Sequence, residues 1–254
     1  MWGTGIKRLF LIPILLLTGY AASAAGLNQS AFNASSQSYE YGYRSIPNVS
    51  IAGAPADTDW KRSAMLHDGL DYRLYFFKKG SESILYQFAF NPDRGAYEHG
   101  YKSIPVLKIA GAPNDIDSRR LMMLHDGSDY RLYMGRQGRP SAFYQFSFNP
   151  RTSDYEFGRN SIPVVNINGM PGDTDWNRTA MLHDGSDYRF YAMRAGSNDT
   201  VYQAAFNRSS SRYEYGYQSI KTLRIVGMPA LRGLADPAML HDRRNYRLYF
   251  HDGY

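Results

Sequence analysis

One block of sequence occurs four times in this 254-residue chain, at regular intervals of 58 residues and without gaps. Every copy carries a Tyr-Glu pair, a Ser-Ile pair, a Met-Leu-His-Asp segment and a Tyr-Arg-Leu/Phe-Tyr block. The copies begin near Tyr39, Tyr97, Tyr155 and Tyr213. A repeat of this length is typical of propellers and solenoids, in which each unit buries its apolar surface against its neighbours. The repeat therefore restricts the fold to an array of four similar units.

The residue pattern inside one copy predicts four short strands separated by turns rich in Gly, Asp, Asn and Pro. In the first copy these strands cover residues 64–67, 72–77, 85–91 and 97–101. Within the second strand, alternate residues are apolar on both faces, so this sheet must be packed on both sides. We therefore predict an all-β fold, a four-bladed β-propeller in which each copy forms one blade.

The two ends of the repeat array predict how it closes. The fourth copy stops at Tyr254, which corresponds to Gly80, so it lacks a strand like that at 85–91. Residues 29–33 match 87–91 in register, and we expect residues 28–38 to complete the last blade. Such closure leaves no exposed strand edge, whereas an open array would need polar caps at its ends.

The first residues read as an export signal. The basic pair Lys7-Arg8 precedes an apolar run from Leu9 to Leu17, and Ala22-Ser23-Ala24 forms a cleavage signature. This run is too short to span a bilayer core of about 30 Å. We predict a signal peptide over residues 1–24 and a single mature domain over 25–254 that has no membrane span and is secreted or periplasmic. The alternative is an uncleaved N-terminal anchor.

Composition excludes several classes of chemistry. The chain has no cysteine, which excludes disulfides, thiolate metal sites and a cysteine nucleophile. Lys and Arg outnumber Asp and Glu by 29 to 23, but the charges are mixed along the chain, so we expect no nucleic-acid partner. The 22 tyrosines have two interpretations, a recognition surface or packing between blades.

The order of the motifs resembles the blade of the hemopexin-like family. The resemblance covers about residues 39–254 and rests on Tyr75-Phe-Phe-Lys-Lys-Gly80, Leu85-Tyr-Gln-Phe88, Gly100-Tyr-Lys-Ser-Ile104, Gly111-Ala-Pro113 and Asp115-Ile-Asp117. It implies four blades around an axial tunnel, with haem, matrix proteins, polyamines or ions as ligands of family members. This chain departs from the family in its longer repeat, and without cysteine it cannot form the disulfide that joins the first and last blades.

Four histidines form the candidate ligand site. His67, His125, His183 and His241 occupy one position of the repeat, so a closed ring relates them by approximate fourfold symmetry. One interpretation is a site at the tunnel mouth for a transition metal or an anion. The other is packing between blades, with each ring hydrogen-bonded to an Asp or Tyr. Backbone groups lining the tunnel would suit a calcium, sodium or chloride ion.

These patterns predict an exported, non-enzymatic binding module of hemopexin-like type, with a protein or a glycan as its ligand. The alternatives are haem or metal binding at the tunnel, or an enzyme with a site at the tunnel mouth. No nucleophile elbow, P-loop, HExxH or EF-hand motif occurs in the sequence. The repeated glutamates (Glu40, Glu98, Glu156, Glu214) and arginines (Arg73, Arg131, Arg189, Arg247) are expected to form structural ion pairs or hydrogen bonds between blades. Because Asp71, Asp129 and Asp187 become Asn245 in the fourth copy, we expect no fourfold acidic site.

Overall fold

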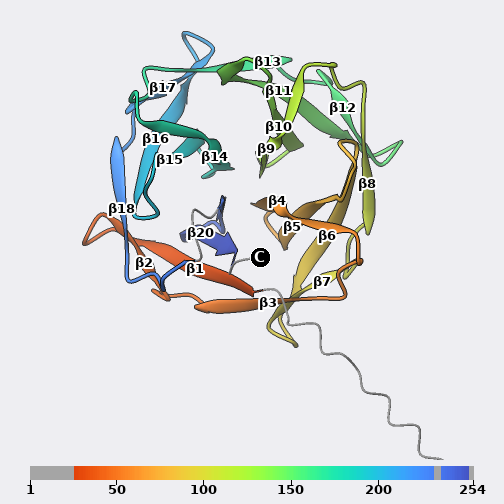
Figure 1. Cartoon of the computed structure of the whole chain (residues 1–254), viewed down its shortest axis with the longest axis horizontal. Helices are drawn as coiled ribbons and strands as arrows, with labels where there is room; N and C mark the ends of the chain where they lie inside the picture. The colour runs from red at the N-terminus through yellow and green to blue at the C-terminus, as the bar shows by residue number, and fades with distance from the viewer. Residues whose placement is uncertain (1–25, 232–235, 252–254) are drawn as a thin grey trace, which may run out of the picture.

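In the computed structural model the described residues are 26–231 and 236–251, so the leader expected over residues 1–24 lies outside them. Within these ranges the chain is all β, with twenty strands joined by hydrogen bonds into one ring-like sheet (Figure 1). No helix in the described part of the chain is long and apolar enough to cross a membrane.

The strands fall into four groups that follow the sequence repeat. The first unit contains β4 (Thr58–His67), β5 (Tyr72–Lys78), β6 (Ile84–Asn91), β7 (Ala96–His99) and β8 (Val106–Ala110). The second contains β9 (Ile116–His125), β10 (Tyr130–Arg136), β11 (Arg139–Asn149), β12 (Asp154–Phe157) and β13 (Val164–Asn168). The third contains β14 (Thr174–His183), β15 (Tyr188–Arg194), β16 (Thr200–Asn207), β17 (Arg212–Tyr215) and β18 (Thr222–Val226). The fourth joins β19 (Pro237–His241) and β20 (Tyr246–His251) to β1 (Gly26–Asn33), β2 (Ser38–Tyr41) and β3 (Asn48–Ala52).

Each unit has five strands, one more than the sequence pattern predicted. β4, β5 and β6 are antiparallel, and the outer edge of β6 is shared by two short strands, β7 at one end and β8 at the other. β8 also pairs in parallel with β12 of the next unit, and β13–β17, β18–β2 and β3–β7 repeat this link. We call these four parallel pairs the outer belt. The segment expected to be only a connection between units therefore holds the units together.

The N-terminal strand closes the ring as expected. β1 lies antiparallel to β20, with Gln29 opposite Tyr249, just as Gln87 lies opposite Tyr75 in the first unit. β1 also pairs with β2 and β3, so the N-terminal segment supplies the outer three strands of the fourth unit. The inner strands β4, β9, β14 and β19 are neighbours around the central axis.

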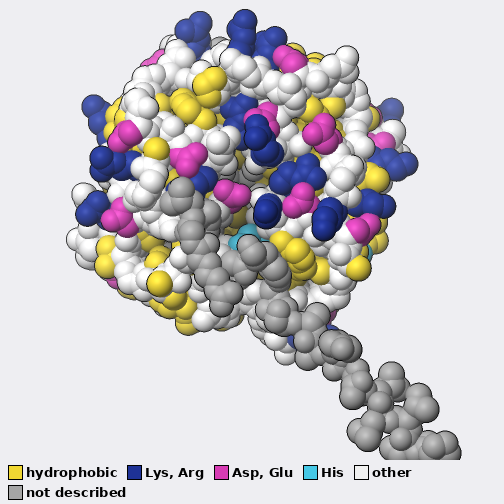
Figure 2. Space-filling view, viewed as in Figure 1, with side chains coloured by type: hydrophobic (Ala, Val, Ile, Leu, Met, Phe, Trp, Pro, Cys, Tyr) yellow, Lys and Arg dark blue, Asp and Glu magenta, His cyan; other side chains and the backbone are white. Residues whose placement is uncertain are grey.

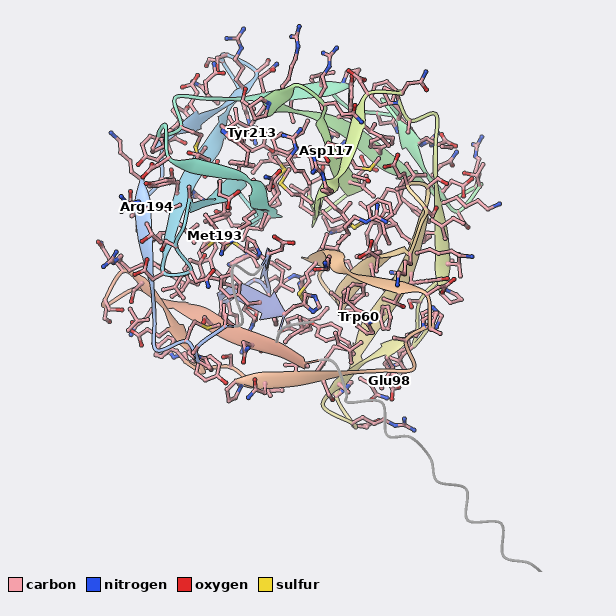
Figure 3. All side chains as sticks on the ribbon, in the orientation of Figure 1. Trp60, Glu98, Asp117, Met193, Arg194 and Tyr213 are labelled. Atoms are coloured by element: carbon pink, nitrogen blue, oxygen red, sulfur yellow. The ribbon has the colours of Figure 1, made fainter. Side chains whose placement is uncertain are left out.

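The apolar core lies between the units and is divided into four clusters, one at each junction. Both faces of the second strand of each unit are buried, as the sequence predicted: Leu74 and Phe76 pack toward the fourth unit, and Tyr75 and Phe77 toward the second. In the third unit, Tyr213 and Met193 likewise lie in different clusters, on opposite faces of the same sheet (Figure 3). Each unit therefore depends on both of its neighbours for burial.

Charged side chains are mixed on the surface seen in Figure 2, where Lys and Arg lie among Asp and Glu. This face shows no continuous basic stripe of the kind a nucleic-acid-binding protein presents.

Deletion of residues 28–38 is expected to destabilise the protein strongly. The deletion removes β1 from between β20 and β2 and exposes a strand edge together with apolar faces in two junction clusters. We expect a loss of roughly 3–5 kcal/mol in unfolding free energy, measured by urea denaturation. A chain that begins at Gly26 is the control and should retain full stability. If the deletion variant and the chain that begins at Gly26 had equal midpoints of urea denaturation, ring closure by β1 would be contradicted.

Candidate functional site

Four equivalent pockets lie where neighbouring units meet, and we call them the junction pockets. Their volumes are about 300 Å³ at the fourth–first junction, 320 Å³ at the first–second, 360 Å³ at the second–third and 180 Å³ at the third–fourth. Three of them therefore reach the lower end of the range for small-molecule sites, about 300–1,000 Å³. Because the pockets follow the repeat, the first–second pocket illustrates the arrangement that they share.

Two neighbouring units form the walls of each pocket. At the first–second junction, the first unit contributes Arg73, Tyr75, Gln87, Lys102, Ser103, Ile104 and Leu107, and the second contributes Tyr130, Phe148 and Tyr155. The three aromatic residues of the second unit contact one another in edge-on and tilted arrangements, with ring centroids 5.9 Å apart for Tyr130 and Phe148 and 5.6 Å apart for Phe148 and Tyr155. Tyr155 is buried, whereas Tyr130 and Phe148 keep part of their surface exposed.

The arginine of each pocket is held in place by aspartates of its own unit, two in the first three units and one in the fourth. Arg73 donates from Nε to Asp68 at 2.5 Å and from Nη2 to Asp71 at 3.2 Å. Its Nη1 donates to the carbonyl oxygen of Lys102 at 3.3 Å, which ties the rim of the pocket to β5. The side chain of Arg73 is only 12% exposed, so its guanidinium is a fixed wall of the pocket.

The same aspartate links the units to each other. Asp68 accepts a hydrogen bond from the hydroxyl of Tyr130 in the second unit at 2.9 Å. Equivalent bonds join Tyr188 to Asp126, Tyr246 to Asp184 and Tyr72 to Asp242 at 3.0–3.1 Å. We call this closed series of four Arg–Asp–Tyr contacts the polar ring.

The electrostatics of the polar ring keep its aspartates ionised. Burial alone would raise the pKa of Asp68, but hydrogen bonds from the backbone N–H of Asp71 and from Arg73 outweigh burial and hold the pKa at about 2. Burial and the neighbouring Asp68 carboxylate raise the pKa of Tyr130 to about 12, so its hydroxyl stays protonated as a donor. The repeated arginines thus form structural ion pairs, but with aspartates of their own unit and not with the repeated glutamates or between units as expected. Each glutamate instead accepts from an asparagine on the third strand of its unit, as Glu98 does from Asn91 at 2.9 Å.

One serine hydroxyl in each pocket is buried without a hydrogen-bond partner. These serines occupy a single position of the repeat: Ser45, Ser103, Ser161 and Ser219. The neighbouring glutamine is satisfied by contrast, because the amide of Gln87 lies 3.1 Å from the hydroxyl of Tyr75. Buried polar groups in folded proteins are nearly always paired. An unpaired hydroxyl repeated in all four pockets is therefore a hydrogen-bonding group that a water molecule or a ligand can satisfy.

The rim of each pocket has an unusual backbone. Arg44, Lys102, Asn160 and Gln218 all have φ between 42° and 45°, the left-handed region that non-glycine residues seldom adopt. This conformation directs the carbonyl oxygen toward the pocket arginine, which donates to it in every unit. Two residues further on, an isoleucine is exposed at the pocket mouth, Ile46 by 47% and Ile220 by 37%. Backbone strain of this kind concentrates at functional sites.

The four predicted histidines lie elsewhere, at the ends of the inner strands. His67, His125, His183 and His241 surround an axial space of only about 10 Å³, enough for about one water molecule and far smaller than a haem. Each ring packs against a tyrosine of its own unit, with centroids 4.5–4.7 Å apart. Burial lowers the pKa of all four.

Across the described ranges, no three His, Asp or Glu side chains are grouped so that they could hold a metal ion. Ligand binding by the four histidines, and an ion in the axial space, stay predictions.

The junction pockets themselves were missed at the sequence level. The sequence shows their arginines and tyrosines as a repeated set, and it supports ion pairs or hydrogen bonds for the arginines and either packing or a recognition surface for the tyrosines. The Ser-Ile pair is the signal in the sequence that points to these pockets. Its isoleucine recurs in every copy, and an apolar residue that recurs in this way either packs against the chain or binds a partner. Sequence alone gives no distance between units, so it could not show that these residues face a shared cavity.

No family model and no curated protein matches the chain. Among solved structures, it is similar to SapL1 lectin in complex with alpha methyl fucoside, with a TM-score of 0.34 and 13% identity over 74% of this chain and 54% of the other. It is also similar to AofleA from Arthrobotrys oligospora, with a TM-score of 0.36 and 12% identity over 76% and 50% of the two chains. This chain thus aligns with about half the length of each.

We predict that the contribution of the polar ring to the unfolding free energy depends on pH. The pKa of Asp68 in the folded protein, about 2, lies below the value of about 3.9 for an unfolded aspartate. Its stabilisation is therefore complete above about pH 5 and is lost as the pH falls through about 2. We expect Asp68→Asn to lower the unfolding free energy at pH 7 by about 2–3 kcal/mol and to reduce the slope of stability between pH 5 and 2.

Urea denaturation across this pH range measures both effects. Asp93→Asn, which changes an exposed carboxylate in the β6–β7 turn, is the matched control and should leave stability within about 0.5 kcal/mol. If Asp68→Asn behaved like this control at pH 7, the polar ring would not link the units energetically.

Proposed function

We propose that this protein is a non-enzymatic saccharide-binding protein whose four junction pockets each hold a sugar residue. We further propose that the ring is a four-bladed β-propeller in which each five-stranded unit is one blade. The burial of both faces of every unit, and the four inner strands around one axis, support that interpretation. Membership of the hemopexin-like family and export by the predicted leader stay predictions.

The unpaired serine hydroxyl is the observation that carries the saccharide proposal. A ligand without hydroxyl or amide groups would leave Ser103 and its three equivalents unpaired, at a cost of about 1–3 kcal/mol for each one. A sugar hydroxyl can both donate to and accept from this serine. Since the orphan hydroxyl occurs four times, a polyhydroxylated ligand accounts for a feature of every pocket.

The other walls of the pocket suit the remaining surface of a sugar. Tyr130 and Phe148 present partly exposed aromatic rings, against which the C–H face of a pyranose can pack. Ile104 adds an apolar contact at the mouth, and the guanidinium of Arg73 is fixed in the wall by its carboxylates. Few, fixed polar groups within an apolar wall are typical of small-ligand sites.

The lining of the pockets supports binding without cleavage. Hydrolysis of a glycosidic bond ordinarily needs two carboxyl groups that face the sugar. None of the lining residues of the four junction pockets, all within the described part of the chain, is an Asp, Glu or His. Of the two ligand classes expected from the sequence, the glycan is favoured over the protein, because a stable protein interface needs about 800 Å² on each partner and not separate small cavities.

The test uses the unpaired serines directly. A variant with Ser45→Ala, Ser103→Ala, Ser161→Ala and Ser219→Ala removes four hydroxyls that have no hydrogen-bond partner among the described residues. We expect it to melt at the same temperature as the parent or higher, but to bind saccharide about 5–10-fold more weakly at each site. Binding is first located on a glycan array and then measured by calorimetry with the sugars found.

Ser209→Ala, an exposed position in the β16–β17 turn, is the matched control and should bind like the parent. The proposal fails if no saccharide binds, or if the quadruple variant binds as tightly as the parent.

A further inference from the structure

The four junction pockets share their aromatic and serine residues but differ in charge. The difference arises at two positions of the repeat. At the rim, the fourth–first pocket carries Arg44 and the first–second pocket carries Lys102. The second–third and third–fourth pockets carry the neutral Asn160 and Gln218 there. The second position lies two residues before the pocket arginine. In three units it is an aspartate whose carboxylate accepts from Nη2 of that arginine, and in the fourth unit it is Asn245.

These substitutions leave one pocket with an excess of positive charge. At the fourth–first junction, Arg44 and Arg247 face a single carboxylate, that of Asp242, which lies 2.5 Å from Nε of Arg247. The first–second pocket has two cations, Arg73 and Lys102, and two carboxylates. Its second carboxylate is that of Asp71, at the repeat position that Asn245 holds in the fourth unit. The other two pockets each have one arginine and two aspartates. The local charge thus changes from positive to negative around the ring.

The side chain of Arg44 is available to a ligand. It is exposed at the rim, and among the described residues no carboxylate lies within ion-pair distance of it. Its guanidinium lies 5.3 Å from the ring centre of Tyr43, and its backbone carbonyl accepts from Nη1 of Arg247 at 3.2 Å. The charge of Arg44 is therefore anchored beside the pocket but not neutralised.

The adjoining turn adds two more cations on the fourth unit. Arg243 and Arg244 occupy the positions held by Gly69 and Leu70 in the first unit. Arg243 has φ of 69°, where the other three units have glycine, so an arginine replaces glycine at a backbone that favours glycine. Its guanidinium reaches across the junction to Gly69 of the first unit. A strained backbone that places a cation at this junction adds to the positive field there.

We propose that the fourth–first junction pocket binds an anionic saccharide, a sugar bearing a carboxylate or a sulfate, whereas the second–third and third–fourth pockets bind neutral sugars. This inference rests on the proposed saccharide function and adds a specificity to one of its four sites. Arg44 is the residue that selects the anionic group, and Asn245 contributes by leaving Arg247 without its second carboxylate. The chain then carries non-equivalent sites for two classes of sugar.

The experiment compares matched ligands at one site. The probes are the methyl glycosides of glucose, galactose and mannose, the corresponding methyl uronates with a free carboxylate, and 6-sulfated methyl galactoside, each titrated by calorimetry. At 20 mM salt we expect one site per chain to bind an anionic probe about tenfold more tightly than its neutral partner, and this preference to fall to about twofold at 0.5 M salt. The uronate and sulfate arms show which anionic group the site accepts.

Charge exchange between pockets assigns the site. Arg44→Asn with Asn245→Asp reproduces the residues of the second–third pocket, so this variant should fold and should lose the anionic preference but keep neutral binding. Asn160→Arg with Asp129→Asn should create a second anionic site. Lys79→Gln, at the opposite end of β5 from the pockets, is the charge control and should retain the preference.

Two failures are distinguishable. If neutral and anionic probes bind equally, or if the Arg44→Asn/Asn245→Asp variant keeps the preference, this inference is wrong while saccharide binding stands. If no probe binds to the folded parent and the glycan array is also empty, the proposed function itself is wrong.

Discussion

Burial of both faces of every unit is the constraint on which the rest of this structure depends. A sheet such as β4–β6 has apolar residues on each side, so it is stable only between two similar sheets. Four such units satisfy one another only if the last meets the first, and β1 makes that contact by pairing with β20. The repeat, the ring and the position of the N-terminal strand are therefore consequences of one requirement.

The same requirement creates the cavities. Sheets that radiate from a common axis are close together at the inner strands and separate toward the outside, so the interface cannot be filled uniformly by side chains. Near the axis the junctions are packed by aliphatic residues such as Leu66 and Met123. Further out, large aromatic residues line the junction but leave space between them. The polar ring fixes the position of both walls, since Asp68 is bonded to Arg73 on one side and Tyr130 on the other.

Sequence reasoning predicted the parts of the fold that follow from periodicity. The 58-residue repeat, the alternation along residues 72–77 and the match of 29–33 with 87–91 gave four units, two-faced sheets and the closing strand. It did not predict β8, because Pro105 precedes this strand and alternate side chains are exposed, a pattern that also fits a connecting loop. It also directed attention to the histidines, whose equivalence is visible in the sequence. The spaces between units depend on the angle between sheets, and no local pattern encodes that angle.

The outer belt has a consequence for the dynamics of the surface. β8 exposes alternate side chains, yet its backbone is bonded to β6 on one edge and to β12 on the other. Amide protons of this strand that are bonded to β12 can exchange with solvent only when a junction opens. Outer strands usually fray first, but here the perimeter should open together with the interior. The unfolding of any unit is thereby coupled to that of both its neighbours, and the ring behaves as one cooperative body.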